Sequence, residues 1–72
     1  MDKENDCRMF RLYAKLPNAK RFAPMDYGRG VTVGNLIYAT LFSQAEADKL
    51  MAELDDLEAI NPGWFFQVRP AS

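Results

Sequence analysis

The stretch Ser43-Gln44-Ala45-Glu46, which begins the segment SQAEADKLMAELDDLEAI (residues 43–60), decides the fold because it marks the start of a helix. A serine at the N-cap accepts a hydrogen bond from an unpaired amide of the first turn, and a glutamate three residues later reaches back to the cap. Apolar residues then recur at three- and four-residue spacing, which is typical of an amphipathic helix with its carboxylates in water. Asn61-Pro62-Gly63 ends the helix near Ile60. The apolar stripe, centred on Leu54, consists of Ala47, Leu50, Met51, Leu54 and Leu57.

Two segments alternate between apolar and polar residues, which predicts half-buried strands. The first runs from Met9 to Leu16 and stops at Pro17-Asn18, and the second runs from Trp64 to Val68 behind the helix. A third segment, Asn35 to Phe42, carries no charge and predicts a strand covered on part of both faces.

The segment Lys20–Gly34 is punctuated by Pro24 and three glycines, so a long regular element is not expected there. Counted from Pro17, residues 17–34 would make eighteen residues without structure, which would be unusual in so small a domain, and we therefore expect short extended pieces. These are predicted near Arg21–Ala23 and Val31–Val33.

These elements predict an α+β fold: a small ββαβ domain with a three-stranded antiparallel sheet under one amphipathic helix. The helix returns the chain antiparallel to the first strand, which favours the spatial order 2-1-3. The 72 residues make one domain, residues 1–72, in which residues 1–7 are predicted to be a disordered polar lead.

The residues that most catalytic and metal sites need are scarce. The chain has no histidine and one cysteine, Cys7, so it has neither a zinc set nor an internal disulfide. Asp55 and Asp56 are adjacent on the predicted helix and diverge by about 100°, so they do not share a ligand. Gly28–Gly34 lacks the strand–loop–helix context of a phosphate-binding loop. We therefore predict no enzymatic activity, no metal and no cofactor, and, since no signal peptide or membrane segment is evident, a cytoplasmic location.

Charge is distributed in two blocks. Between Arg8 and Arg29 six basic residues stand against one acidic residue, whereas from Ser43 onward six acidic residues stand against two basic ones. The net charge of −1 argues against a general polyanion binder. Two oppositely charged faces are the simplest interpretation.

The sheet face turned away from the helix is the surface most suited to binding. If Phe10, Leu12 and Ala14 face the helix, their strand neighbours face outward, and the same alternation applies to the other strands. Three explanations stay open for this outer face: residues 20–34 cover it, a partner protein or second copy buries it, or single-stranded nucleic acid stacks on Tyr13, Tyr38 and Phe65. The candidate binding residues are Arg11, Tyr13, Lys15, Tyr38, Phe65 and Arg69.

A resemblance to other proteins extends over residues 9–69. It rests on residues 20–26 (KRFAPMD), residues 35–42 (NLIYATLF), the acidic helix and Asn61-Pro62-Gly63-Trp64. The chain resembles a group of small uncharacterised proteins of phages and mobile elements of gut bacteria. No activity or catalytic residue is assigned to that group, so the resemblance implies only a context. Short phage-encoded cytoplasmic proteins without catalytic groups commonly bind and redirect a host protein, including defence machinery.

The sequence therefore favours a non-enzymatic interaction module, phage or mobile-element encoded, that binds and modulates a host or phage protein, with a defence-system inhibitor as one form. The first alternative is a single-stranded nucleic-acid-binding protein that uses the aromatic and basic sheet face. The second is a small structural or accessory subunit that is stable as a homo-oligomer, for which a homodimer is the simplest case. No membrane partner is predicted.

Overall fold

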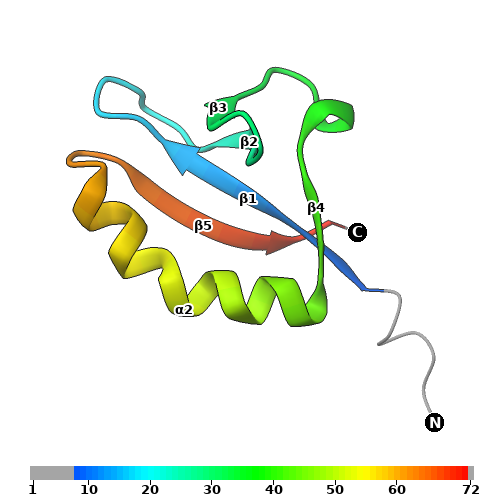
Figure 1. Cartoon of the computed structure of the whole chain (residues 1–72). Coiled ribbons are helices and arrows are strands. Elements are labelled where there is room, and N and C mark those ends of the chain that lie inside the picture. The colour runs from blue at the N-terminus through cyan, green and yellow to red at the C-terminus, as the bar shows by residue number, and fades with distance from the viewer. Residues whose placement is uncertain (1–7, 72) are drawn as a thin grey trace, which may run out of the picture.

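A computed structural model describes residues 8–71 and contains one α-helix against an antiparallel sheet (Figure 1). The predicted α+β class with a single helix is confirmed. The predicted polar lead at residues 1–7, including Cys7, lies outside the described residues. Within residues 8–71 no helix has the length and apolar character needed to cross a membrane. The elements are β1 (Met9–Lys15), β2 (Ala23–Asp26), β3 (Val31–Thr32), the 3₁₀ turn η1 (Leu36–Tyr38), β4 (Leu41–Ser43), α2 (Gln44–Ile60) and β5 (Phe65–Pro70).

The central strand is β1, and every pairing in the sheet is antiparallel. β5 runs along one edge of β1, whereas β2 and β4 share the other edge, β4 beside its N-terminal part and β2 beside its C-terminal part. β3 pairs with β2, so the order is β3-β2-β1-β4 with β5 on β1. The predicted three strands in the order 2-1-3 are therefore not matched exactly: the sheet has five strands.

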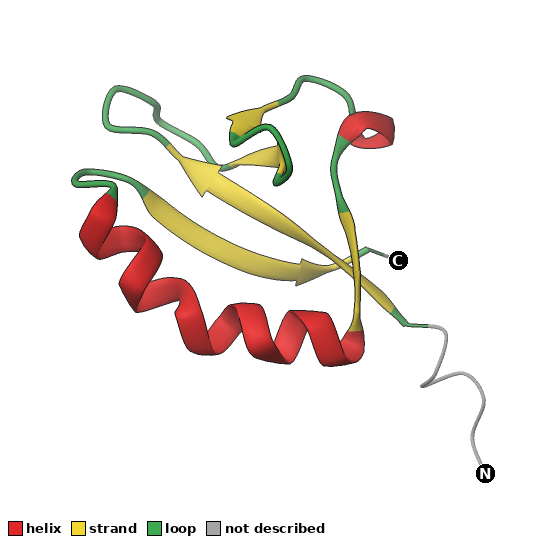
Figure 2. Cartoon of the chain, viewed as in Figure 1, coloured by secondary structure: helices red, strands yellow, loops and turns green. Residues whose placement is uncertain are grey.

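The extra strands arise because the chain leaves the edge of β1 and returns to it. After β2 the chain makes the β2–β3 hairpin and η1, and the Thr40 amide then donates to the Met25 carbonyl at 3.0 Å. β4 continues along the edge that β2 began (Figure 2). Residues 26–40 thus leave the edge of β1 after β2 and return to it at β4. Side-chain periodicity does not reveal this interruption of the edge.

The predicted strand Asn35–Phe42 is wrong over most of its length. The Asn35 side chain accepts from the Ile37 amide at 3.1 Å and its carbonyl accepts from the Tyr38 amide at 3.0 Å. These local bonds replace ladder bonds and close a 3₁₀ turn, as asparagine often does. Only Leu41–Ser43 is a strand, and Phe42 rather than Leu41 is buried.

The core lies between α2 and one face of the sheet (Figure 1). The predicted inward residues of β1 and β5 are confirmed, since Phe10, Leu12, Ala14 and Phe66 are buried. The predicted helix stripe needs one correction: Met51 is 45% exposed, because the helix turns its other apolar residues to the sheet. The buried cluster is Phe10, Leu12, Ala14, Met25, Phe42, Ala47, Leu50 and Phe66, with Leu16, Leu54, Leu57, Trp64 and Val68 packed around it.

The predicted capping box is present at the start of α2. The Glu46 amide donates to Ser43 Oγ at 3.2 Å, and the Ser43 amide donates to Glu46 Oε1 at 2.8 Å. Phe42 and Ala47, the residues on either side of this box, both belong to the buried cluster. The cap therefore fixes the point at which the edge strand becomes a helix.

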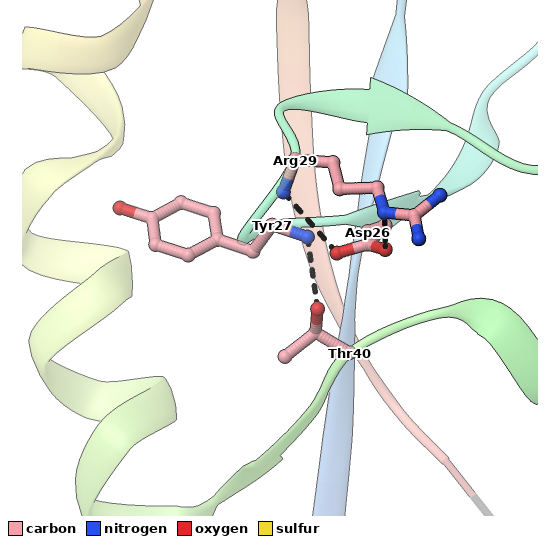
Figure 3. Close-up of polar contacts among 4 residues, drawn as sticks. All are labelled: Asp26, Tyr27, Arg29 and Thr40. Carbon is pink, nitrogen blue, oxygen red and sulfur yellow. Dashed lines mark hydrogen bonds and ion pairs between the residues drawn. The ribbon is translucent and has the colours of Figure 1, made fainter.

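The β2–β3 hairpin is held by Asp26 at its turn (Figure 3). Asp26 Oδ1 accepts from the Arg29 amide at 3.3 Å, and Asp26 Oδ2 lies 3.6 Å from Arg29 Nε. The Tyr27 amide donates to Thr40 Oγ1 at 2.8 Å, which ties the hairpin to the segment before β4. The short extended piece predicted near Val31–Val33 is confirmed as β3 at Val31–Thr32, whereas the piece predicted near Arg21–Ala23 lies two residues further along, in β2.

Candidate binding face

The outer face is the side of the sheet turned away from α2. Since the buried residues of β1, β4 and β5 face the helix, the residues between them face the other side. This alternation confirms the outward placement predicted for β1 and β5. The face carries Met9, Arg11, Tyr13 and Lys15 from β1, Leu41 from β4, and Phe65, Gln67 and Arg69 from β5.

Two of the cations on this face are fixed on aromatic rings. The Arg69 guanidinium lies 4.4 Å from the ring centre of Tyr13 and 5.5 Å from that of Phe22, and its Nε donates to Gln67 Oε1 at 2.9 Å. Lys15 Nζ lies 5.5 Å from the ring centre of Phe65, its partner in the β1–β5 register. Such contacts contribute about 0.5–1 kcal/mol each at exposed sites. The charged groups are therefore held at the surface before any partner arrives.

The third cation, Arg11, stands directly opposite Arg69 across β1 and β5. Like charges at opposed positions of a sheet destabilise it, so this pair costs the isolated domain free energy. Arg11 Nη1 donates to the Ala71 carbonyl at 3.1 Å, whereas its Nε is buried without a hydrogen-bond partner. A buried unpaired donor is also unfavourable.

The outer face is positive over β1, β4 and β5, and Asp26 of β2, which the register places on the same side as Pro24 and Tyr13, is paired with Arg29. None of the outer-face residues of β1, β4 and β5 is acidic, and they include three cations. Among residues 8–71 the one ion pair joins Arg29 and Asp26 in the hairpin turn. The carboxylates of α2 belong to the opposite layer of the molecule (Figure 1). The two charge blocks of the sequence therefore become two layers.

Residues 20–34 leave most of the outer face open. Met25 is buried in the core, and the ring of Tyr27 packs edge-on against Phe42 at 5.7 Å, on the side of α2. Phe22 lies beside Arg69, and Pro24 stands opposite Tyr13 in the β1–β2 register, so both lie at the outer face. The segment therefore covers the outer face only beside β2, where Phe22 and Pro24 lie.

The structure brings together five of the six candidate residues: Arg11, Tyr13, Lys15, Phe65 and Arg69. The sixth, Tyr38, lies on η1, because the strand predicted for it does not form. Its side chain is 63% exposed and lines a shallow pocket with Asp26, Arg29, Val33 and Gly34.

Three residues at the outer face are absent from the binding residues predicted from the sequence: Phe22, Gln67 and Leu41. Phe22 and Gln67 position Arg69, and Leu41 is the cross-strand neighbour of Arg11. The alternation of β5 already puts Gln67 on this face, but the contact of Phe22 depends on how the chain enters β2. Leu41 faces outward because its neighbour Phe42 takes the buried position opposite Phe10.

The free edge of β5 is less suited to binding than the outer face. The Phe66 amide donates to Glu58 Oε2 of α2 at 3.1 Å, while the Ala71 amide points the other way and donates to Met9 of β1 at 2.8 Å. In an antiparallel strand alternate amides point to the free edge, which in β5 are the positions of Phe66, Val68 and Pro70. The Phe66 amide is bonded to Glu58, and proline has no amide hydrogen. Within β5 this leaves Val68 as the one outward donor, so pairing with another strand is discouraged.

No family model matches the chain, and no curated protein or solved structure matches it. The resemblance to phage and mobile-element proteins is therefore still a prediction.

Proposed function

We propose that this protein is a non-enzymatic interaction module, encoded by a phage or mobile element, that acts in the cytoplasm by binding an acidic surface of a host protein with its outer face. Binding would modulate the host protein by occupying that surface. The observation that carries the proposal is the cross-strand pair Arg11–Arg69 on the part of the outer face formed by β1, β4 and β5, where no residue is acidic.

This pair supports binding because it is unfavourable in the isolated domain and favourable beside an anion. The two guanidinium groups turn apart, Arg11 toward the Ala71 carbonyl and Arg69 toward Tyr13, so an acidic partner surface with carboxylates near both would offset their repulsion and accept charge-assisted hydrogen bonds. Arg69 is already stacked on Tyr13 and Phe22, so little side-chain entropy remains to be lost on binding. Arginine and tyrosine are also the residues most often dominant in protein interfaces.

Protein fits this face better than single-stranded nucleic acid does. Base stacking needs open ring faces, whereas Arg69 lies over Tyr13 and Lys15 lies over Phe65. Three cations also neutralise few phosphates, and the acidic α2 behind the sheet weakens the attraction.

Replacement of Arg69 by glutamate separates binding from folding. Arg69→Glu places a carboxylate opposite Arg11, so the repulsive cross-strand pair becomes attractive while the contacts to Tyr13 and Phe22 are lost. The two effects oppose each other, and the free energy of unfolding should change by less than about 1 kcal/mol. Affinity for the host partner should fall about tenfold or more.

The measurement compares proteins retained by the immobilised wild type and by Arg69→Glu from a lysate of the bacterium that carries the gene, by quantitative mass spectrometry. The matched control is Lys49→Glu, which makes the same reversal of charge on the exposed side of α2. A host protein kept by the wild type and by Lys49→Glu, but depleted on Arg69→Glu, is the expected result, and its affinity is then titrated. Equal retention by all three proteins would contradict the proposal.

A fluorescent single-stranded oligonucleotide tests the alternative. We expect no binding even at low salt, where electrostatic attraction is strongest. If the face did bind nucleic acid through about three phosphates, log affinity would fall with log salt at a slope near −2. Binding with that slope, lost on Tyr13→Ala, would replace the protein-binding proposal by the nucleic-acid one.

A further inference from the structure

The side of α2 turned away from the sheet is acidic. Ala52 is two residues from both Leu50 and Leu54, which pack on the sheet, and two residues turn a helix by about 200°. Ala52 therefore points to solvent, and residues three, four and seven positions away share its side. We call this surface the acidic side, and its exposed residues include Ala45, Asp48, Ala52, Asp55, Asp56 and Ala59. Lys49 is its one cation.

The acidic side complements the outer face in charge. Over β1, β4 and β5 the outer face carries three cations and no carboxylate, whereas the acidic side carries three aspartates and one cation. Among residues 8–71 the sole ion pair joins Arg29 and Asp26, so neither surface finds its counter-charges within one molecule. A net charge of −1 means that a second copy is repelled only weakly. The charges that each copy lacks are therefore present on another copy.

The charges also have a similar spacing on the two surfaces. Lys15 follows Arg11 by four residues, which is about 13 Å along a strand. Asp48 and Asp55 lie seven residues apart, which is about 10 Å along a helix. The flexible stem of a lysine spans the difference. The small alanines along the middle of the acidic side leave room for Phe65, which is 51% exposed, to approach the helix.

The two surfaces lie on opposite layers of the molecule, because α2 covers one face of the sheet and the outer face is the other (Figure 1). A contact between them leaves a free outer face at one end and a free acidic side at the other, so it can be repeated. We propose that copies of this chain associate weakly head to tail, with the outer face of one on the acidic side of the next. This contact would compete with the host protein for the outer face, a consequence that, unlike the contact itself, rests on the proposed function.

Two charge reversals separate this interface from a general effect of net charge. Arg69→Glu and Lys49→Glu give the same net charge, but the first removes a cation from the outer face and the second adds a carboxylate to the acidic side. Light scattering of the purified chain is compared at about 10 mM salt, where charges act over about 30 Å, and at about 1 M, where the range is about 3 Å. With rising concentration at low salt, the wild-type mass should increase continuously above 8.2 kDa, and at high salt it should stay at one chain. Arg69→Glu should raise the dissociation constant about tenfold or more, whereas Lys49→Glu should lower it.

A second measurement does not depend on any variant. When the wild type is diluted at low salt, NMR amide shifts should change both in β1 and β5 and in α2, because a head-to-tail contact joins two different surfaces. Circular dichroism of both variants checks that they fold. The proposal is overturned if the wild type keeps the mass of one chain at every concentration in low salt, if association persists at high salt, if both variants weaken it equally, or if the shift changes are confined to one surface. Because these measurements use the chain alone, their outcome is separate from the retention of a host protein, which tests the proposed function.

Discussion

Leu12→Ala is expected to leave most of the protein unfolded at room temperature. Leu12 is the largest side chain that is fully buried, at 0% exposed, and it lies at the middle of β1, the strand that contacts β2, β4 and β5. Removal of a buried leucine costs about 2–5 kcal/mol. A domain of this length has about 3–5 kcal/mol of net stability, so one substitution removes most of it.

Urea unfolding followed by circular dichroism, at a concentration low enough to keep the protein monomeric, measures this effect. Leu54→Ala should cost less because Leu54 is only partly buried at the edge of the core. Leu36→Ala, at a side chain 45% exposed, should change stability by less than about 0.5 kcal/mol. A Leu12→Ala midpoint no lower than that of Leu36→Ala would show that the core is not centred on β1.

The elements that were predicted correctly are those whose signal is local. The capping box at Ser43 and Glu46 and the alternation of β1 and β5 depend on residues within a few positions of one another. The same alternation correctly brought Arg11, Tyr13, Lys15, Phe65 and Arg69 to one face, because β1 and β5 pair over their whole length.

The elements that were missed depend on contacts between distant residues. The return of Thr40 to Met25 interrupts the edge strand, and no pattern within residues 35–42 indicates that the chain bends there. An uncharged apolar run predicts burial, but η1 leaves Leu36, Ile37 and Tyr38 in water. Places where local rules fail in this way are often functional.

Gly63→Ala is expected to be the second most damaging change, because Gly63 meets two separate constraints in the turn between α2 and β5. Its φ is +88°, a left-handed conformation that costs an L-residue about 1–2 kcal/mol. A Cβ there would also lie 3.0 Å from Cγ and 3.3 Å from Cβ of Pro17, in the turn that ends β1. The ring of proline cannot rotate away, so one turn must shift, and overpacking of this kind costs about 1–3 kcal/mol more.

Three glycines separate these two costs. Gly30 has a φ of +69°, and a Cβ added there would meet nothing within 4 Å, so Gly30→Ala reports the backbone cost alone. Gly34 has open space and no left-handed φ, so Gly34→Ala should be neutral or stabilise by about 0.4–1 kcal/mol. Urea midpoints should therefore fall in the order Gly34→Ala, Gly30→Ala, Gly63→Ala. Equal losses for Gly30→Ala and Gly63→Ala would mean that the Pro17 turn yields without cost, and that β1 and the α2–β5 turn are not held together at this end of the sheet.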